Sequence, residues 1–397
     1  MNGAHQGREA HGRAPARNRV FARRSFRLAA ILIATGALLG TSDRSRAESF
    51  MPTGDSITEG VGSTSGLGFR HILYTSLNLI GTYDFVGPTG APPDEGTFYT
   101  GARIGDFLAG GVHDLTPTLT DYAPDLVAVH LGTNDIYLQP GPFGPWSADH
   151  STPNPNASGR LGALVNQILA AGRRVVVSRI IPIPGREDDV EIFNREVVRL
   201  ALDYRNGAVT GSAEPVYLAD HYLHFLASPS AGADWMFDAL HPNDDGYDEM
   251  EAVYREAVSE AMSDVTPPAA VTDLAVGTVS GGSVLLIWTN TGDDGTSGDP
   301  RYADSRYATA PLTAPNFKTA GQGGDYRFVG AGGEVSGTRV EGLAPATIHY
   351  FAMKLTDEVP NLSAMSNQVS VATTASENMF VDSFTRTMPA PGPDRSG

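Results

Sequence analysis

Residues 125–131 (DLVAVHL) form a continuous, mostly apolar run, and residues 174–180 (RVVVSRI) repeat this pattern further along the chain. Such runs are typical of parallel strands, which are buried on both faces of their sheet. Strands that alternate with helices predict right-handed crossovers and a three-layer α/β/α sandwich with a parallel sheet. Amphipathic helical patterns lie between and after the runs, at residues 67–79, 161–171, 188–203 and 244–262.

Two polar segments follow expected strands of this sheet. In open parallel sheets, ligands bind beyond the carboxyl ends of the strands. Residues 54–58 (GDSIT) follow the first expected strand and place Ser56 at a strand-to-turn junction, and residues 132–135 (GTND) follow the 125–131 run. Since Gly, Asn, Asp and Ser also form ordinary turns and helix caps, neither segment identifies a site by itself.

An acid and an imidazole stand three residues apart near the end of the α/β region, as Asp238 and His241. Over one helical or turn-like step, two such residues lie on the same side. Asp238 is therefore placed to hold the imidazole in one tautomer, while the other ring nitrogen faces a nucleophile. The alternative is an ordinary ion pair at the end of a helix.

Taken in this order, the segments resemble the four sequence blocks of the SGNH (GDSL-type) hydrolases. The resemblance covers residues 48–263 and implies the flavodoxin-like SGNH fold and a secreted serine esterase without cofactor or metal. It also implies that Ser56 is the nucleophile, His241 its general base and Asp238 the partner of the imidazole.

The resemblance further implies an oxyanion hole. Its donors would be the backbone N–H groups of Ser56 and Gly101 and the side-chain amide of Asn134. Gly101 fits the family's glycine block within residues 99–105 (YTGARIG), and Gly105 is the alternative.

The sequences of residues 51–60 (MPTGDSITEG) and 83–87 (YDFVG) resemble the branch of the SGNH hydrolases that includes carbohydrate esterases acting on acetylated xylan. Alternatives within the family are lysophospholipases or other lipases, thioesterases and arylesterases. An alternative of another class is a noncatalytic carbohydrate-binding or adhesion protein on the same scaffold. The candidate substrate-binding residues are Asp55, beside Ser56, and Trp146, in the long loop beyond Asn134.

A change of composition at residues 264–267 predicts a linker, after which the chain is rich in Gly, Thr and Ser. Residues 268–375 resemble a fibronectin type III domain, with Trp288 at its buried tryptophan and His349 where the family has a corner tyrosine. We expect an immunoglobulin-like sandwich that acts as a spacer or as a weak attachment to polysaccharide. Its expected strands are residues 283–289, 302–307, 338–340, 349–355 and 367–373.

The composition excludes several kinds of chemistry. The 397 residues contain no Cys, which removes thiolate nucleophiles, disulfides and cysteine metal sites. The only lysines are Lys318 and Lys354, so the first three hundred residues contain no lysine for a Ser-Lys dyad. The formal net charge of −17 disfavours nucleic acid as a partner. The resemblance implies an ester substrate, such as an acetylated polysaccharide, as the partner, and we expect a monomer.

The two ends of the chain differ from its body. Residues 1–47 contain nine Arg and an apolar run at residues 28–40 that follows Arg-Arg-Ser-Phe, and they resemble a twin-arginine export signal. The run of about 13 residues is shorter than the roughly 20 that span a bilayer. We expect cleavage after Ala47, an extracellular bacterial product without stable membrane insertion, and a disordered tail at residues 376–397.

Overall fold

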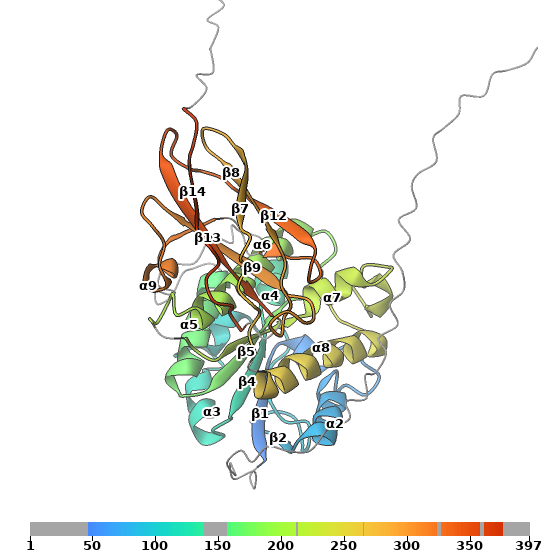
Figure 1. The fold of residues 1–397 in the computed structure, drawn as a ribbon. Coiled ribbons are helices and arrows are strands. Elements are labelled where there is room, and N and C mark those ends of the chain that lie inside the picture. Colours follow the sequence, from blue (N-terminus) through green and yellow to red (C-terminus); the bar gives the residue numbers. More distant parts are fainter. Residues whose placement is uncertain are drawn as a thin grey trace, which may run out of the picture. The chain divides into compact units, whose positions relative to one another are not determined.

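The computed structural model describes residues 47–138, 157–211, 213–264, 266–323, 327–357 and 361–375. The described residues belong to one compact unit, in which a parallel sheet with helices is followed in the chain by antiparallel strands (Figure 1). Among the described residues, no helix is both long enough and apolar enough to cross a bilayer. The expected export signal up to residue 46, the loop with Trp146 and the expected tail lie outside the described residues.

The parallel sheet has the strand order β2-β1-β4-β5-β6, and β3 pairs with the end of β1. All of these pairs are parallel, as the two buried runs predict. The strands are β1 (Glu48–Gly54), β2 (Tyr83–Phe85), β3 (Thr97–Phe98), β4 (Leu126–His130), β5 (Arg174–Arg179) and β6 (Val216–Asp220).

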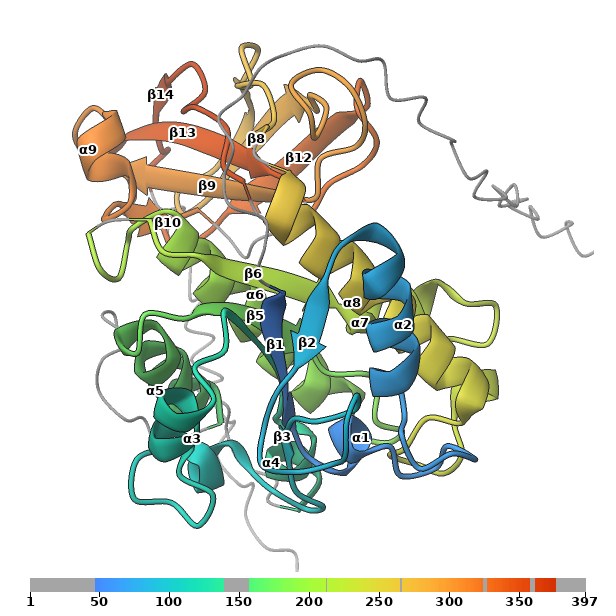
Figure 2. The same ribbon diagram turned by 90° about the horizontal axis from the view of Figure 1, so that it is seen from below.

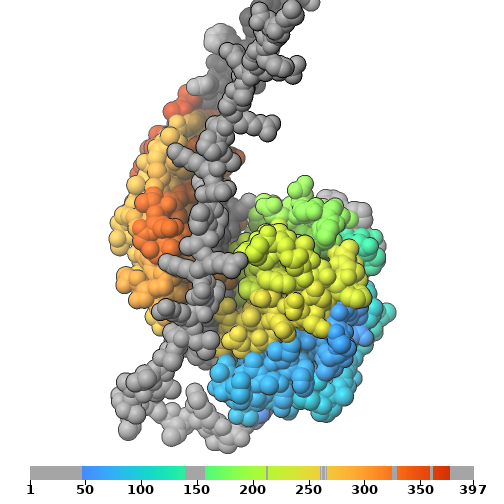
Figure 3. All heavy atoms as spheres, turned by 90° about the vertical axis from the view of Figure 1, so that its right-hand side faces the viewer, coloured from blue at the N-terminus to red at the C-terminus, as the bar shows by residue number. Residues whose placement is uncertain are grey.

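Helices cover both faces of this sheet, which confirms the three-layer prediction. Alternate residues of β4 belong to opposite cores: Val127 and Val129 pack with α3, α5 and α6, and Leu126 and Ala128 pack with α2 and α8. Figure 2 shows the strands between these two helix layers, and α8 (yellow) and α2 (blue) lie side by side in Figure 3. The helices are α1 (Ser56–Glu59), α2 (Arg70–Ile80), η1 (Ile104–Phe107), α3 (Leu115–Asp121), α4 (Thr133–Leu138), α5 (Ala157–Ala170), α6 (Glu187–Arg205), α7 (His221–Ala227), η2 (Ala233–Trp235) and α8 (Asp244–Ser263).

The C-terminal part is an antiparallel sandwich of two sheets, as predicted. One sheet has the order β12-β8-β7, and the other has the order β10-β9-β13-β14 with β11 beside β9. The elements are β7 (Ala275–Val279), β8 (Val284–Thr289), β9 (Tyr302–Ala308), α9 (Ala314–Phe317), β10 (Gly321–Gln322), β11 (Arg327–Phe328), β12 (Val335–Val340), β13 (Ile348–Thr356) and β14 (Val369–Ala372).

Two side chains expected from the fibronectin type III pattern have structural roles in the sandwich. Trp288 is buried in its core, and its indole N–H donates to Asn290 Oδ1 at 2.8 Å. The Nε2 of His349 lies 3.2 Å from the carbonyl oxygen of Ala344, five residues upstream. A side chain at this position thus contacts the backbone a few residues upstream.

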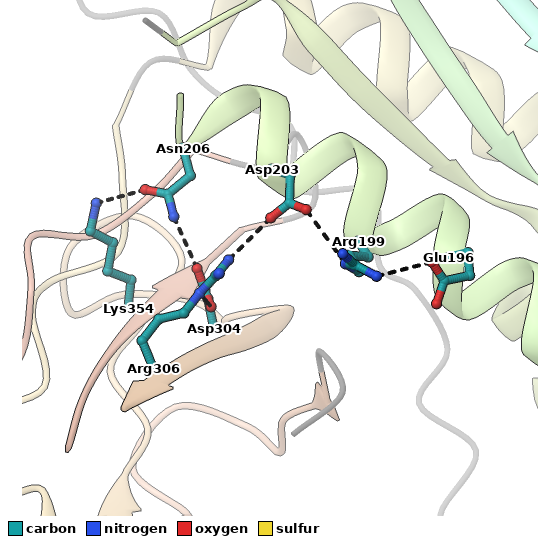
Figure 4. Close-up of polar contacts among 7 residues, drawn as sticks. All are labelled: Glu196, Arg199, Asp203, Asn206, Asp304, Arg306 and Lys354. Atoms are coloured by element: carbon teal, nitrogen blue, oxygen red, sulfur yellow. Dashed lines mark hydrogen bonds and ion pairs between the residues drawn. The ribbon is translucent and has the colours of Figure 1, made fainter. Parts of the chain in front are cut away.

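Strand β9 is joined to α6 by a network of polar contacts (Figure 4). Arg306 donates to Asp203 on α6 at 3.1 Å and to Asp304 at 2.6 Å. Asn206 at the end of α6 donates to Asp304 at 3.1 Å and accepts from Lys354 on β13 at 3.1 Å. Because Asp203, Asp304 and Arg306 are all buried, these are not solvated surface pairs.

The sandwich also contacts strand β6, the last strand in the order of the parallel sheet. Tyr302, the first residue of β9, packs within the hydrophobic core that contains α5 and α6. Its hydroxyl donates to Asp220 at the end of β6. All five residues of β6 are buried, although an edge strand normally leaves backbone groups open to unwanted pairing.

Candidate active site

The site begins where β1 ends. Gly54, the last residue of β1, pairs with His130, the last residue of β4, so the segments after both strands start side by side. A Cβ at Gly54 would lie 2.0 Å from Thr58 Oγ1 and 2.7 Å from the His130 carbonyl oxygen, so only glycine fits this turn. Asp55 caps α1 by accepting the Ile57 N–H at 3.0 Å. The strand-to-helix junction thereby brings Ser56 to the carboxyl edge of the sheet.

Three side chains predicted from the sequence form a continuous chain of hydrogen bonds. Ser56 Oγ lies 2.9 Å from His241 Nε2. On the other side of the ring, His241 Nδ1 lies 2.9 Å from Asp238 Oδ2 and 3.1 Å from Asp238 Oδ1. This is the geometry in which a carboxylate orients an imidazole so that it can take the proton of a serine hydroxyl.

The acid and the imidazole are held by a tight turn rather than by a helix. Phe237 N–H donates to the His241 carbonyl at 2.8 Å, and Asp238 Oδ1 accepts the N–H groups of Leu240 and His241 at 2.7 and 2.8 Å. Partial burial by itself would raise the pKa of Asp238. The hydrogen bonds from the His241 side chain and from the two backbone N–H groups outweigh it and lower this pKa. The carboxyl group is therefore kept ionised beside the imidazole.

Asn134 lies on the first turn of α4, beyond the end of β4, where the sequence predicts it. Its Nδ2 donates to Asp55 Oδ2 at 3.2 Å and to the Ala102 carbonyl oxygen at 3.0 Å. It therefore connects the Ser56 turn to the segment that contains Gly101.

The expectation that Asp55 binds substrate is corrected by its position. Its side chain is completely buried beneath the turn, where it holds Ile57 N–H and Asn134. Burial raises the pKa of Asp55 to about 7, against the lowering effect of the Ile57 N–H, and the charge of Asp135 adds to the increase. Because its side chain does not reach the surface, Asp55 acts as a structural support of the Ser56 turn and of Asn134. Trp146, the other substrate-binding candidate, lies outside the described residues.

The two glycine candidates differ in their surroundings. Gly101 is exposed, has a φ of +76° and lies between Tyr99, whose N–H donates to Gly54 O at 3.1 Å, and Ala102. Gly105 lies within η1, where an added Cβ would lie 3.3 Å from Arg160 Cδ. Gly101 is thus the glycine flanked by contacts to the Ser56 turn and to Asn134, and its role as a donor stays a prediction.

Sequence reasoning gave no role to Asp135 or Arg160. Asp135 accepts the Ile104 N–H at 3.0 Å, and its other oxygen accepts from Arg160 Nη2 at 2.6 Å. The position of Asp135 directly after Asn134 was the only hint of a role in the sequence. Its partners, Ile104 and Arg160, are too far away in the sequence to be predicted from it.

Other histidines lie behind the site. His130 is fully buried, and its ring packs edge-on against His221 at 5.6 Å between centroids. Within the part of the chain that the structure describes, neither ring nitrogen of either residue has a hydrogen-bond partner. The described residues also contain no group of three or more His, Asp or Glu that could hold a metal ion.

Residues 53–249 match the model of the GDSL-like lipase/acylhydrolase family. None of the curated proteins matches the chain. Among solved structures, an acetyl esterase mutant with acetate ion has 23% identity and a TM-score of 0.42, covering 55% of this chain and 100% of its own. A Clostridium thermocellum family 3 carbohydrate esterase has 21% identity and a TM-score of 0.43, covering 55% of this chain and 98% of its own.

A human fibronectin type III domain, derived from the KIAA0970 protein, has 12% identity and a TM-score of 0.20 and covers 32% of this chain and 87% of its own.

The model of the GDSL-like family spans the turn with Ser56, the segment with Asn134 and the turn with Asp238 and His241. Residues 53–249 are thus similar to the GDSL-like lipase/acylhydrolase family, and the protein is a hydrolase of ester bonds.

Proposed function

We propose that the protein is a serine esterase that removes short acyl groups, of the acetylxylan type, from carbohydrate. The observation that carries the serine mechanism is the unbroken chain from Ser56 Oγ through the His241 ring to Asp238. His241 takes the hydroxyl proton as Ser56 Oγ attacks the ester carbonyl carbon. Asp238 stabilises the imidazolium that forms, and it stays ionised throughout.

Collapse of the tetrahedral intermediate breaks the bond to the alcohol oxygen, which leaves with the proton from His241. Water then attacks the acyl-enzyme, with His241 again acting as base, and releases the carboxylic acid and free Ser56. The oxyanion would accept the N–H groups of Ser56 and Gly101 and the side-chain amide of Asn134. In the structure that amide is bonded to Asp55 and Ala102, so one of these bonds must be shared with or exchanged for the oxyanion.

The preference for acetylated carbohydrate is supported by the sequences of residues 51–60 and 83–87, which resemble those of carbohydrate esterases. Residues 51–60 contain the end of β1 and all of α1, around Ser56, and residues 83–87 begin with β2, which pairs with residues 48–50 at the start of β1. We also propose export through the twin-arginine-like signal of residues 1–47. Replacement of Arg23 and Arg24 by Lys should leave the protein inside the producing cell, and N-terminal sequencing of the exported form should begin at Glu48.

The test compares the protein with Ser56→Ala on acetylated xylan, a chromogenic acetate, a long-chain ester and a lysophospholipid. We expect serine-dependent acetate release from xylan and from the chromogenic acetate. Preferred turnover of the long-chain ester or the lysophospholipid would move the substrate assignment to the lipases. Turnover that persists in Ser56→Ala would contradict the serine mechanism, and no turnover of any substrate by either protein would favour a noncatalytic scaffold.

A further inference from the structure

We propose that Asp135 and Arg160 are a positioning pair that holds the Gly101 segment, residues 99–104, against Asn134 and so shapes the oxyanion hole. This inference rests on the proposed esterase function. Asp135 directly follows Asn134 on α4, and its carboxyl group is completely buried. A buried carboxylate needs both a cation and hydrogen-bond donors, and Asp135 has both.

Each carboxylate oxygen of Asp135 has a separate partner. Oδ2 accepts the N–H of Ile104 at 3.0 Å, where η1 begins, and Oδ1 accepts from Arg160 Nη2 on α5 at 2.6 Å. The contact to Ile104 fixes where the Gly101 segment ends. The contact to Arg160 neutralises the charge and fixes the orientation of the carboxyl plane, since charge-assisted hydrogen bonds are strong and directional.

Three backbone contacts hold the Gly101 segment to β1 and α4, and the Thr100 hydroxyl also donates to Glu59 of α1. Tyr99 N–H donates to Gly54 O at 3.1 Å, Ala102 O accepts from Asn134 at 3.0 Å, and Ile104 N–H donates to Asp135. Gly101 itself has no atoms within 4 Å of an added Cβ, so side-chain packing at that point does not hold it. Its N–H direction therefore depends on the backbone contacts on either side.

Two neighbouring residues of α4 provide two of the three contacts. Asn134 holds Ala102 and Asp135 holds Ile104, so a shift of the Asp135 side chain moves the glycine segment relative to the Asn134 amide. Misplacement of a reacting group by about 1 Å can cost on the order of a hundredfold in rate. Loss of the pair should consequently slow the chemical step more than it weakens substrate binding.

The experiment measures kcat and KM for the full chain on a chromogenic acetate. Asp135→Asn loses either the Arg160 or the Ile104 contact, because its amide has one acceptor oxygen. We expect kcat to fall by about ten- to a hundredfold while KM changes by less than about threefold. Arg160→Gln should show the same pattern, and Arg160→Lys, which retains the charge, should recover part of the lost kcat. The Arg160 side chain is 25% exposed, so its substitution keeps the test available if Asp135→Asn does not fold.

A matched control exists in the same domain. Asp220 also pairs with an arginine, Arg179, at 3.0 Å and accepts a backbone N–H, that of Leu223, at the start of a helix. Asp220→Asn should lower thermal stability and leave kcat per folded molecule unchanged. The positioning role is overturned if Asp135→Asn and Arg160→Gln keep the parent kcat, or if Asp220→Asn loses as much. Failure of the esterase proposal itself would be seen separately, as unchanged turnover in Ser56→Ala.

Discussion

Tyr302 of the antiparallel sandwich is buried in the hydrophobic core of the parallel-sheet part and donates its hydroxyl hydrogen to Asp220. Asp220 is also paired with Arg179 at 3.0 Å, so the contact joins the sandwich to the ends of both β5 and β6. The sandwich thus shares a buried tyrosine and a buried charged network with the parallel-sheet part. We therefore expect the two parts to unfold together.

The stability of this contact can be tested at Arg306. Its guanidinium lies between Asp203 and Asp304, and all three residues are buried. Arg306→Gln leaves two buried carboxyl groups without this cation, a change that costs about 3–5 kcal/mol when a buried pair is broken. In calorimetry, the parent should unfold in one transition. Arg306→Gln should have a lower Tm and two transitions, one for each part.

The matched control is Arg339→Gln, which replaces an arginine of the same sandwich whose contacts, to Ser283 and Thr278, are exposed. This substitution should change the free energy of unfolding by less than about 1 kcal/mol. Equal effects of the two substitutions would show that the buried network stabilises the protein no more than exposed polar contacts do.

Asn134→Ala tests the oxyanion hole. The substitution removes an amide donor and should reduce kcat by about 100–1,000-fold with little change in KM. Because Asn134 also holds Ala102 and Asp55, the Tm of the variant should be measured with its kinetics. A folded Asn134→Ala protein with the parent kcat would exclude this residue from the hole.

Asp55 should make stability depend on pH. Its pKa is raised from 3.8 to about 7 in the folded protein, so the unfolded chain loses this proton first as the pH rises. The free energy of unfolding should thus fall between about pH 4 and pH 7 through this group. In Asp55→Asn this fall should be smaller, and kcat should drop because Asn134 or Ile57 loses its acceptor. An unchanged pH dependence of urea unfolding would argue against the buried, protonated carboxyl group.

His130 should limit stability in acid. Burial lowers its pKa from 6.5 to about 4, so below pH 6.5 the unfolded chain binds a proton that the folded protein does not. Stability from this group is present above pH 6.5 and is lost as the pH falls toward about 4. His130→Phe should unfold at lower pH than the parent does in an acid titration followed by circular dichroism. His71→Gln, at a position where the side chain is 53% exposed, is the control and should unfold near the parent pH.

Much of the fold was predictable because its signals are local. The run at residues 125–131 contains β4, whose side chains alternate between two cores, and its mostly apolar sequence alone indicates a buried strand. The Ser56, Asn134 and Asp238–His241 segments follow strands or turns, where glycine and short polar residues indicate a special backbone. The structure brings these segments to one edge of the sheet.

Contacts between distant, individually ordinary residues were not predictable. The burial of Asp55 depends on Asn134, which is 79 residues away, and the pairing of Asp135 with Arg160 depends on how α5 packs. The attachment of β9 to α6 likewise requires Asp203 and Arg306, 103 residues apart, to meet in three dimensions. No periodicity within either segment encodes such a meeting, because it is decided by the packing of whole elements.

In the proposed mechanism, Ser56 is a nucleophile activated by His241. The most direct test of this mechanism is covalent labelling with a fluorophosphonate ester, followed by peptide mapping of the adduct by mass spectrometry. One adduct should form per chain, on Ser56, with labelling abolished in Ser56→Ala and strongly slowed in His241→Gln. An adduct on another residue, or labelling of Ser56→Ala at the parent rate, would contradict this mechanism.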